Sequence, residues 1–401
     1  MAVGLGNTTI LNQTTDFAKK SYAALITRLM PNGSAPLFGM TSMLPTKTAL
    51  QFEHGYFSKT MLFPSLTVSA AGQATGDGTF TIVANNNLMP GMLFRNNLTG
   101  ENIVINTVVS STSVTVTRAV GTVAAGAWAA SQAANMVGNA FEESSLRPAP
   151  QYIVPARVTN YTQIFRNSWG MSATVESTQT IAGSGNRAEN KNDAAMFHAV
   201  DLEKALFFGQ KFLGTRNGQP FHTMDGLVNR IQVDAPGNIT TLGATTNFTQ
   251  LEAAVDPVFE TATDPKVANE RIMFVGGTAR KVLNAIGRLN GTYFLSADTN
   301  IYGLRYETFR LSRGTFNVIE HPLFNSNVDW KKMGVIVDLT SFNIAYLGDR
   351  NTKYQEYGTD GVPVDNGIDA VGGTFTTECT TEITNPSASG VLYNFTAGAV
   401  G

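Results

Sequence analysis

The sequence predicts an α+β protein in which one long helix crosses a largely β chain. Residues 186–209 contain no Pro or Gly before Gly209 and place apolar residues at helical spacing. Residues 66–137 are almost free of charge and consist of short β runs between turn residues. Residues 230–348 mix helical and strand patterns. Together these three observations indicate a backbone helix, an all-β insertion and a compact α/β lobe.

The long helix is predicted from an apolar stripe of Ala188, Ala195, Ala199, Leu202 and Leu206. Gly209 is expected to end it in the left-handed conformation. Glu203 falls inside the apolar arc, and a buried carboxylate requires a cationic or hydrogen-bonding partner. We therefore expect Glu203 to form a structural or intersubunit ion pair, in preference to acting as a general base. Asp201 and Lys204 lie on the far side of the helix, and His198 lies on the rim of the stripe, where a hydrogen-bonded structural histidine is expected.

The composition excludes several classes of protein. Lys and Arg total 28 against 30 Asp and Glu, so the chain lacks the basic balance of a typical nucleic-acid binder. Only 14% of residues are charged, against about 25% in typical globular domains, which favours a surface covered by other chains over a large β core buried on both sides. Cys379 is the single cysteine, which excludes an intramolecular disulfide and a cysteine-based metal cluster. The sequence shows no secretory signal and no apolar run long enough to span a membrane, so we expect a protein made in a reducing cytoplasm.

The first third of the chain is expected to contain an arm and an insertion. Residues 1–15 are polar and 16–30 can form an amphipathic helix. Residues 50–63 and 138–145 resemble two legs that carry the 66–137 segment. Strands this short, at intervals of about 8–12 residues, predict a small antiparallel sandwich or barrel inserted into a loop.

The rest of the chain is expected to alternate strands and helices. Residues 157–179 are predicted as strands, including 163–166 and 171–176. Residues 247–261 are predicted as a helix divided by Pro257, and 278–290 as a second helix. The remaining predicted strands are 271–275, 306–311, 316–320, 334–339, 342–347, 373–384 and 391–395. The last two are expected to return to the 157–179 sheet, because they have no partner nearby in sequence.

The best enzyme-like signal is Gly276–Lys281, a Gly pair between a strand and a helix with Thr278 as the expected N-cap. Such a helix start can hold a phosphate, with Arg280 and Lys281 nearby. The segment matches neither the P-loop nor the dinucleotide fingerprint, so a tight turn with Gly at positive φ is the favoured interpretation.

No other constellation indicates chemistry. The four histidines lack metal-ligand spacing, and Cys379 lies in an alternating strand where a packing role is expected. Glu142 and Glu143 are adjacent and would point to opposite faces of a strand, so a structural salt bridge or a solvated edge is favoured over a catalytic pair. We expect no cofactor and no metal.

Four motifs occur here in the order seen in tailed-phage major capsid proteins: Asn160–Ile164, Met171–Val175, Arg187–Glu189 and Asp201–Leu206 followed by Gly209. The chain resembles most narrowly the family typified by phage SU-ten. The resemblance extends in organisation from Leu50 to the C-terminus and in motifs from Glu142 to Gly209. The chain departs from that family in its extended loop, which in the family is often shorter and more charged.

The resemblance implies the Hong Kong 97-type capsid fold, with a long spine helix, a β-rich peripheral domain, an α/β axial domain and an all-β insertion in the extended loop. The implied parts are an N-terminal arm (1–49), the extended loop (50–145, module 66–137), the peripheral domain (146–229, spine helix 186–209), the axial domain (230–348) and a return to the peripheral domain (349–401). The implied structural or intersubunit contacts are Glu142, Glu143, Arg187, Asp201, Glu203 and Lys204.

The resemblance also implies a non-enzymatic function. The chain would form pentamers and hexamers of an icosahedral or prolate shell around double-stranded DNA, assembled in the host bacterial cytoplasm and retained in the virion. Decoration, scaffolding and portal proteins are the expected partners, DNA would be met non-specifically, and no membrane is expected. The alternatives are another virion component, such as a tail or decoration protein, and an α/β enzyme that binds a phosphorylated ligand at residues 276–281.

Overall fold

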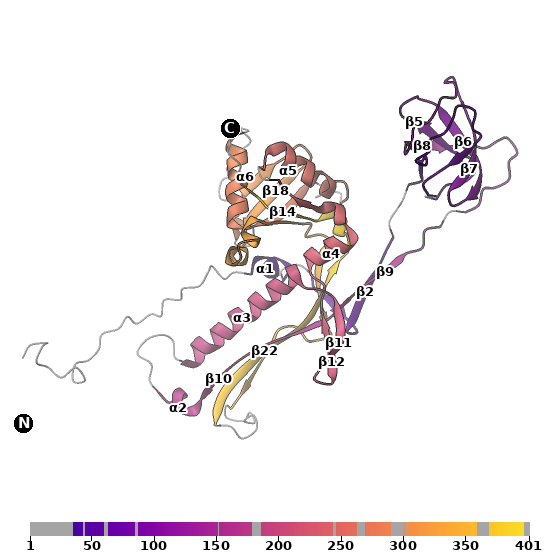
Figure 1. Ribbon diagram of the computed structural model, residues 1–401. Coiled ribbons are helices and arrows are strands. Elements are labelled where there is room, and N and C mark those ends of the chain that lie inside the picture. Colours follow the sequence, from indigo (N-terminus) through magenta and orange to yellow (C-terminus); the bar gives the residue numbers. More distant parts are fainter. Residues whose placement is uncertain are drawn as a thin grey trace, which may run out of the picture. The chain divides into compact units, whose positions relative to one another are not determined.

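A computed structural model describes residues 35–42, 45–59, 63–84, 87–150, 152–178, 186–243, 246–262, 269–289, 300–301, 304–305, 307–358 and 369–396 (Figure 1). The chain forms two compact units, divided at Tyr56/Phe57 and Ala156/Arg157. The second unit is thus a single insertion into the first. Each unit is described by itself.

The first unit is built on helix α3 (Asn186–Phe208), which lies along strand β10 (Gln163–Ser172) (Figure 1). The predicted long helix is therefore confirmed. Its inner face buries Ala194, His198, Leu202, Glu203, Leu206 and Phe207. Leu202 and Leu206 belong to a core that also contains Phe165 of β10 and Phe274 of the α/β lobe, so α3 packs on both layers of this unit.

The sheet beside α3 has the order β1-β20-β22-β10, with β1 at Lys47–Ala49, β20 at Phe342–Leu347 and β22 at Ala370–Ile383. β22 runs antiparallel to β10 from Cys379 opposite Gln163 to Ala370 opposite Ser172. Strand β21 (Lys353–Tyr357) pairs with the first part of β22. The prediction that 373–384 returns to the 157–179 sheet is confirmed.

The predicted strand at 171–176 is wrong beyond Ser172. Residues Ala173–Glu176 form a short helix, α2, because the Ser172 hydroxyl accepts a hydrogen bond from the Val175 amide and caps the turn. Strand preference of Thr174 and Val175 is outweighed here because Val175 is exposed and gains nothing from sheet packing.

The second sheet of this unit has the order β13-β23-β19-β14-β18-β17. Its strands are Ile239–Thr241 (β13), Gly390–Tyr393 (β23), Gly334–Val337 (β19), Glu270–Val275 (β14), Thr315–Glu320 (β18) and Glu307–Arg310 (β17). Helices α5 (Phe248–Val255) and α6 (Gly277–Leu289) pack on it, and a 3-10 turn at Asp256–Phe259 ends α5 at Pro257, as predicted. The short strands β15 (Asn300–Ile301) and β16 (Leu304–Arg305) pair with each other.

Two strands enter a different sheet from the one predicted. The 391–395 strand does not return to the 157–179 sheet: β23 pairs with β19 and β13, because Val391 faces the core under α3 and Leu392 faces the opposite core. The neighbouring strands β19 and β20 were expected in one lobe, but they lie in different sheets. Between them, the Asp338 carboxylate accepts hydrogen bonds from the Thr340 amide and hydroxyl and so fixes the turn.

After α3 the chain forms a hairpin of β11 (Phe212–Arg216) and β12 (Gln219–Thr223) and then helix α4 (Leu227–Asp234). Gly209 does not adopt a positive φ, contrary to the prediction. A Cβ at Gly209 would lie 2.6 Å from the carbonyl oxygen of Met224, and the Gly226 amide donates to the Gly209 carbonyl at 2.9 Å. Glycine is therefore required here by the close approach of two backbone segments.

Three short elements complete the first unit: helix α1 (Pro36–Ser42) and the two-stranded sheet of β2 (Glu53–Ser58) and β9 (Ala156–Tyr161). The predicted helix at 16–30 lies outside the described residues. Strands β2 and β9 are the segments that leave and re-enter the first unit at the insertion (Figure 1).

The second unit contains a six-stranded antiparallel sheet, β3-β8-β5-β6-β7-β4. The strands are Ser65–Thr67, Thr79–Thr81, Met92–Asn96, Asn102–Ser110, Ser113–Thr117 and Ala133–Asn139 for β3 to β8 in chain order. A bridge between Val68 and Ile82 joins the continuations of β3 and β4, so the sheet closes on itself. Of the two predicted architectures, the second unit is therefore the barrel. Closing the sheet in this way removes its free edge strands.

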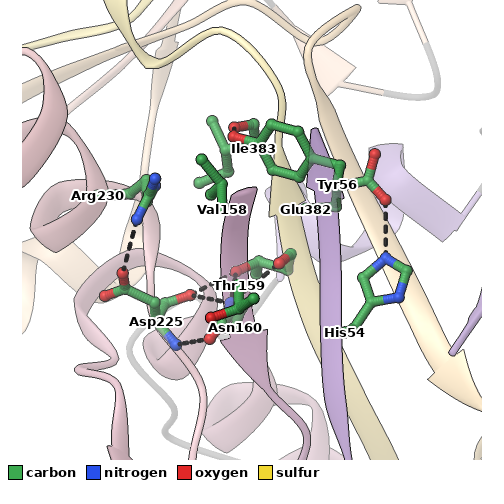
Figure 2. Close-up of a pocket in the computed structure, with 10 residues that line it drawn as sticks. His54, Tyr56, Val158, Thr159, Asn160, Asp225, Arg230, Glu382 and Ile383 are labelled. Atoms are coloured by element: carbon green, nitrogen blue, oxygen red, sulfur yellow. Dashed lines mark hydrogen bonds and ion pairs between the residues drawn. The ribbon is translucent and has the colours of Figure 1, made fainter. Parts of the chain in front are cut away.

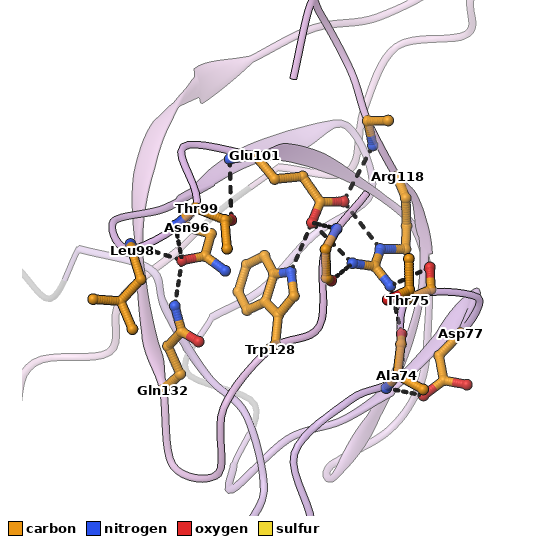
Figure 3. Close-up of polar contacts among 12 residues, drawn as sticks. Ala74, Thr75, Asp77, Asn96, Leu98, Thr99, Glu101, Arg118, Trp128 and Gln132 are labelled. Carbon is orange, nitrogen blue, oxygen red and sulfur yellow. Dashed lines mark hydrogen bonds and ion pairs between the residues drawn. The ribbon is translucent and has the colours of Figure 1, made fainter. Parts of the chain in front are cut away.

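The second unit contains a buried ion pair between Glu101 and Arg118. The carboxylate of Glu101 is fully buried and accepts hydrogen bonds from Arg118 (3.0 and 2.8 Å) and from the Trp128 indole (2.9 Å) (Figure 3). The amides of Ala119 and Gly126 donate to the same group. Burial alone would raise the pKa of Glu101, but these donors outweigh it and lower that pKa to about 2.

Candidate functional site

Residues from five segments meet where the insertion leaves the first unit. We call His54, Tyr56, Asp225, Arg230 and Glu382 the loop-root cluster; they line a small pocket together with β9 residues Val158 to Asn160 (Figure 2). His54 and Tyr56 lie on β2, Glu382 on β22 and Arg230 on α4. The cluster therefore ties β2, the strand that leads out of the first unit, to the rest of that unit.

Glu382 is the center of the contacts on one side of this cluster. Its carboxylate is nearly buried and bonds to the Lys47 ammonium at 2.5 Å and to His54 Nε2 at 2.8 Å. Burial pulls the pKa of Glu382 upward, but the hydrogen bonds from Lys47 and His54 outweigh it and hold that pKa below its usual range. One carboxylate thus fastens both β1 and β2 to β22. The hydroxyl of Tyr56 adds a further hydrogen bond to the Ile383 carbonyl.

On the opposite side of the cluster two carboxylates, Asp225 and Asp234, lie beside the single positive charge of Arg230. Burial raises the pKa of Asp225 and of Asp234, although Arg230 opposes this effect at both carboxylates. Arg230 forms an ion pair with Asp234 and lies 4.0 Å from Asp225. Asp225 also accepts a hydrogen bond from Asn229 at 2.5 Å. The positive charge of Arg230 is therefore shared by two carboxylates.

Asn160 and Gln163, both in the motif at 160–164, form hydrogen bonds with backbone groups of distant segments. The Asn160 amide donates to the Thr381 carbonyl and hydroxyl, both at 2.9 Å, and its oxygen accepts from the Asp225 amide at 2.8 Å. Gln163 accepts from the Met224 amide at 3.1 Å. Both side chains thus hold the segment that enters α4 against β9, β10 and β22. Nothing in the local sequence pattern could have indicated these partners, because they lie about 60 residues or more away along the chain.

A second polar cluster lies between α3, α1 and the α/β lobe. The fully buried Glu203 carboxylate accepts hydrogen bonds from the amides of Leu37 at 2.8 Å and Phe38 at 2.7 Å. His321, at the end of β18, lies with its Nε2 2.7 Å from the same carboxylate. We call Leu37, Phe38, Glu203 and His321 the arm-root cluster. The sequence indicated that Glu203 needs a partner, and the structure supplies two backbone amides and a histidine.

The other sequence-predicted contact residues lie apart from these clusters. Arg187 pairs with Glu356 at 2.8 Å and Glu176 at 3.3 Å, and Asp201 accepts a hydrogen bond from Asn167 at 2.8 Å. Lys204, Glu142 and Glu143 are exposed. Their role as contacts between subunits stays a prediction.

The helix start at residues 276–281 is filled by the protein's own groups. The Gly277 amide donates to the Asn325 side chain at 2.8 Å, and Arg280 pairs with Glu307 and, at 2.8 Å, with Glu320. The predicted N-cap at Thr278 is wrong, because α6 already begins at Gly277. Positive φ is not the reason for the glycines either: a Cβ at Gly276 would lie 2.5 Å from the backbone of Lys331. The Gly277 amide and the Arg280 guanidinium, which a phosphate would need, are therefore already bound by side chains of this chain.

The predictions for His198 and Cys379 are confirmed. His198 is buried and bonds through Nδ1 to Asn167 and through Nε2 to the Thr377 hydroxyl, both at 2.7 Å. Cys379 is a buried free thiol, and burial raises its pKa to about 12. Among the described residues, no group of three or more potential ligands could hold a metal ion. None of the helices in the described part of the chain is long and apolar enough to cross a membrane.

Large apolar side chains are exposed on both connections between the first unit and the barrel, before β3 and after β8, and from here on we call these connections the legs. Phe57, Phe63, Leu146, Tyr152 and Val154 are each between 73% and 92% exposed. Such residues gain stability only when another surface covers them. Exposed apolar surface of this kind is typical of chains that other chains cover.

The comparison with solved structures identifies this fold as the Hong Kong 97-type capsid fold. The chain aligns with the capsid protein of the structure titled "Capsid of native GTA particle" with a TM-score of 0.50, covering 98% of this chain and 99% of that one at 10% identity. Mycobacterium phage Bobi gives a TM-score of 0.46 over 94% and 96% of the two chains at 13% identity.

Sequence comparison gives the family. The chain matches the model of the SU10 major capsid protein family over residues 9–396, and it belongs to that family. It is 36% identical to the major capsid protein of Pseudomonas phage PaMx41, over 97% of this chain and 95% of that one. The function is that of a phage major capsid protein, a structural role in the shell of the virion.

Proposed function

We propose that copies of this chain associate as pentamers and hexamers and close into the icosahedral or prolate shell that encloses phage double-stranded DNA. The observation that supports this proposal best is the exposure of the apolar legs, since Phe57, Phe63 and Tyr152 are 73% or more exposed in the single chain. In a shell, neighbouring copies would cover these side chains, and weak contacts repeated over many copies would give a stable assembly. No catalytic step is part of this function.

The proposal also assigns each part of the chain a place in the subunit. Residues 1–49 would be the arm, 50–145 the extended loop, 146–229 with 349–401 the peripheral domain and 230–348 the axial domain. Two strands cross these boundaries: β20 belongs to the peripheral sheet and β23 to the axial sheet. Exposed charges such as Lys204, Glu142 and Glu143 would contact neighbours. Scaffolding, portal and decoration proteins would be separate partners, assembly would take place in the host cytoplasm, and DNA would be met through its phosphates without sequence preference.

The test is negative-stain electron microscopy with sedimentation velocity on the protein expressed alone and with its neighbouring genes. We expect closed shells, or pentamers and hexamers in exchange with shells. A single small oligomer under both conditions would overturn the proposal, and tubes or rings without closed shells would favour a tail protein.

A pair of variants tests the role of the legs. Phe57→Asp with Phe63→Asp should abolish shells while leaving the unfolding midpoint of the subunit unchanged, because both side chains are exposed before assembly. Val109→Asp, at a 62% exposed position on β6 of the barrel, serves as the matched control. Normal shells from the leg variant would contradict the proposal that neighbours cover the legs.

A further inference from the structure

The arm-root cluster joins three parts of the first unit that are far apart in sequence. Helix α1 lies within the proposed arm (1–49), Glu203 is near the end of α3, and His321 follows β18 of the α/β lobe. The Leu37 amide and Glu203 are separated by 166 residues. One carboxylate thus holds the start of the described chain to both layers of the body.

The surroundings of Glu203 leave the carboxylate dependent on these partners. Its side chain is 0% exposed and that of His321 is 1% exposed. The His321 ring stacks on Phe324 at 4.4 Å between centroids and meets Phe207 and Phe274 edge-on, so apolar rings enclose it. His321 Nδ1 has no hydrogen-bond partner, so the ring's one hydrogen bond is the one that Nε2 donates to the Glu203 carboxylate.

His321 supplies one hydrogen bond, and the two α1 amides are the other donors to the buried carboxylate. If α1 leaves, Glu203 keeps His321 alone and loses two charge-assisted hydrogen bonds. Leu37 and Met40, which are 0% and 2% exposed, would also leave the core that contains Leu202 and Leu206. The body is therefore incomplete without α1.

We propose that Glu203 is the positioning residue of a latch that anchors the root of the arm, with α1 of the same chain as its occupant. The chain after α1 supports an occupant from the same copy: four residues separate Ser42 from β1, and β1 pairs in parallel with β20 of this chain from Lys47 opposite Ala345. The 36–42 part of the proposed arm is therefore packed on the body of the subunit. The use of the arm in assembly rests on the proposed function; the latch itself does not.

Hydrogen exchange on the full-length protein tests the latch directly. Glu203→Gln replaces one acceptor oxygen by an amide NH2 group, which donates and cannot accept from a backbone N–H. We expect the exchange rates of the Leu37 and Phe38 amides to rise about tenfold or more, with the α/β lobe strand β14 unchanged. Asp201→Asn, two residues away on the exposed side of α3, is the matched control. Unchanged rates in Glu203→Gln would overturn the proposal.

A double-mutant cycle covers the case in which the single variant folds poorly. In the full chain Glu203→Leu should destabilise, because the α1 amides lose their acceptor. In a full-length Leu37→Pro background, which removes one of the two donating amides, the same change should be less costly, because the carboxylate that it removes has already lost a donor. The urea midpoint measures both effects. Equal costs of Glu203→Leu in the two backgrounds would overturn the latch, whatever the particles look like in the microscope. Loss of shells with unequal costs would bear only on assembly.

Discussion

Replacing Glu101 by Gln should destabilise the barrel without destabilising the first unit. The folded barrel lowers the pKa of Glu101 from its ordinary 4.5 to about 2 through Arg118, Trp128 and two backbone amides. Each pKa unit corresponds to about 1.4 kcal/mol, so the ionised carboxylate contributes about 3 kcal/mol at neutral pH. Because this pKa is lowered on folding, the contribution is fully present above pH 4.5 and is lost as the pH falls from there toward 2.

Glu101→Gln should lower the free energy of unfolding of the barrel by at least this amount. Glu101→Gln leaves the Arg118 guanidinium, which is 9% exposed, without its carboxylate, and removing one partner of a buried pair typically costs about 3–5 kcal/mol. Replacing both partners, with Glu101→Leu and Arg118→Met, should cost less than the single change because no buried charge is left.

Hydrogen exchange resolves the two units in the full-length chain. We expect faster exchange at β6 and β7 in Glu101→Gln, with α3 and β22 unchanged, and the same local opening in the wild type below about pH 4. Glu142→Gln, at an exposed carboxylate of the second unit, is the control. If exchange at β6 and β7 rises no more in Glu101→Gln than in Glu142→Gln, the reasoning that the Glu101 network stabilises the barrel is refuted.

Three further predictions concern the first unit. Gly226→Ala should lower the free energy of unfolding in urea by about 2–4 kcal/mol, because its Cβ would lie 2.5 Å from the Gly209 nitrogen. The control is Gly237→Ala, which should be near neutral because nothing lies within 4 Å of its Cβ. Equal losses in the two variants would contradict this prediction. Glu382→Gln should speed hydrogen exchange in β1 and β2 by breaking the bonds to Lys47 and His54. Since the pKa of Glu382 is lowered on folding, wild-type protection there should fall as the pH drops below 4.5; pH-independent protection in the wild type would refute this. Cys379, with its pKa raised to about 12 and its side chain buried, should resist a maleimide at pH 8 until denaturant is added; rapid native labelling would exclude the described packing of β22.

Local pattern was sufficient for the elements and for some individual residues. The 186–209 helix, the division at Pro257 and the short strands of the insertion follow from periodicity and turn residues. The buried polar nature of Glu203 followed from its position in an apolar arc, and the packing role of Cys379 from its alternating strand. The order of four motifs was sufficient for the family, which the whole-chain match confirms.

Contacts between distant segments were decided only by the tertiary structure. The pairing of β23 with β19, the closure of the barrel at Val68 and Ile82, and the clamp of Asn160 on Thr381 all join segments whose sequence patterns carry no information about each other. Gly209 shows the same limit: the sequence indicated a glycine at a helix end, but the reason is a backbone approach from Gly226 and not a positive φ. Periodicity determines which face of an element is apolar, since it depends on the residues of that element alone. Which partner covers that face, and which amides reach a buried carboxylate such as Glu203, depends on the packing of the whole chain.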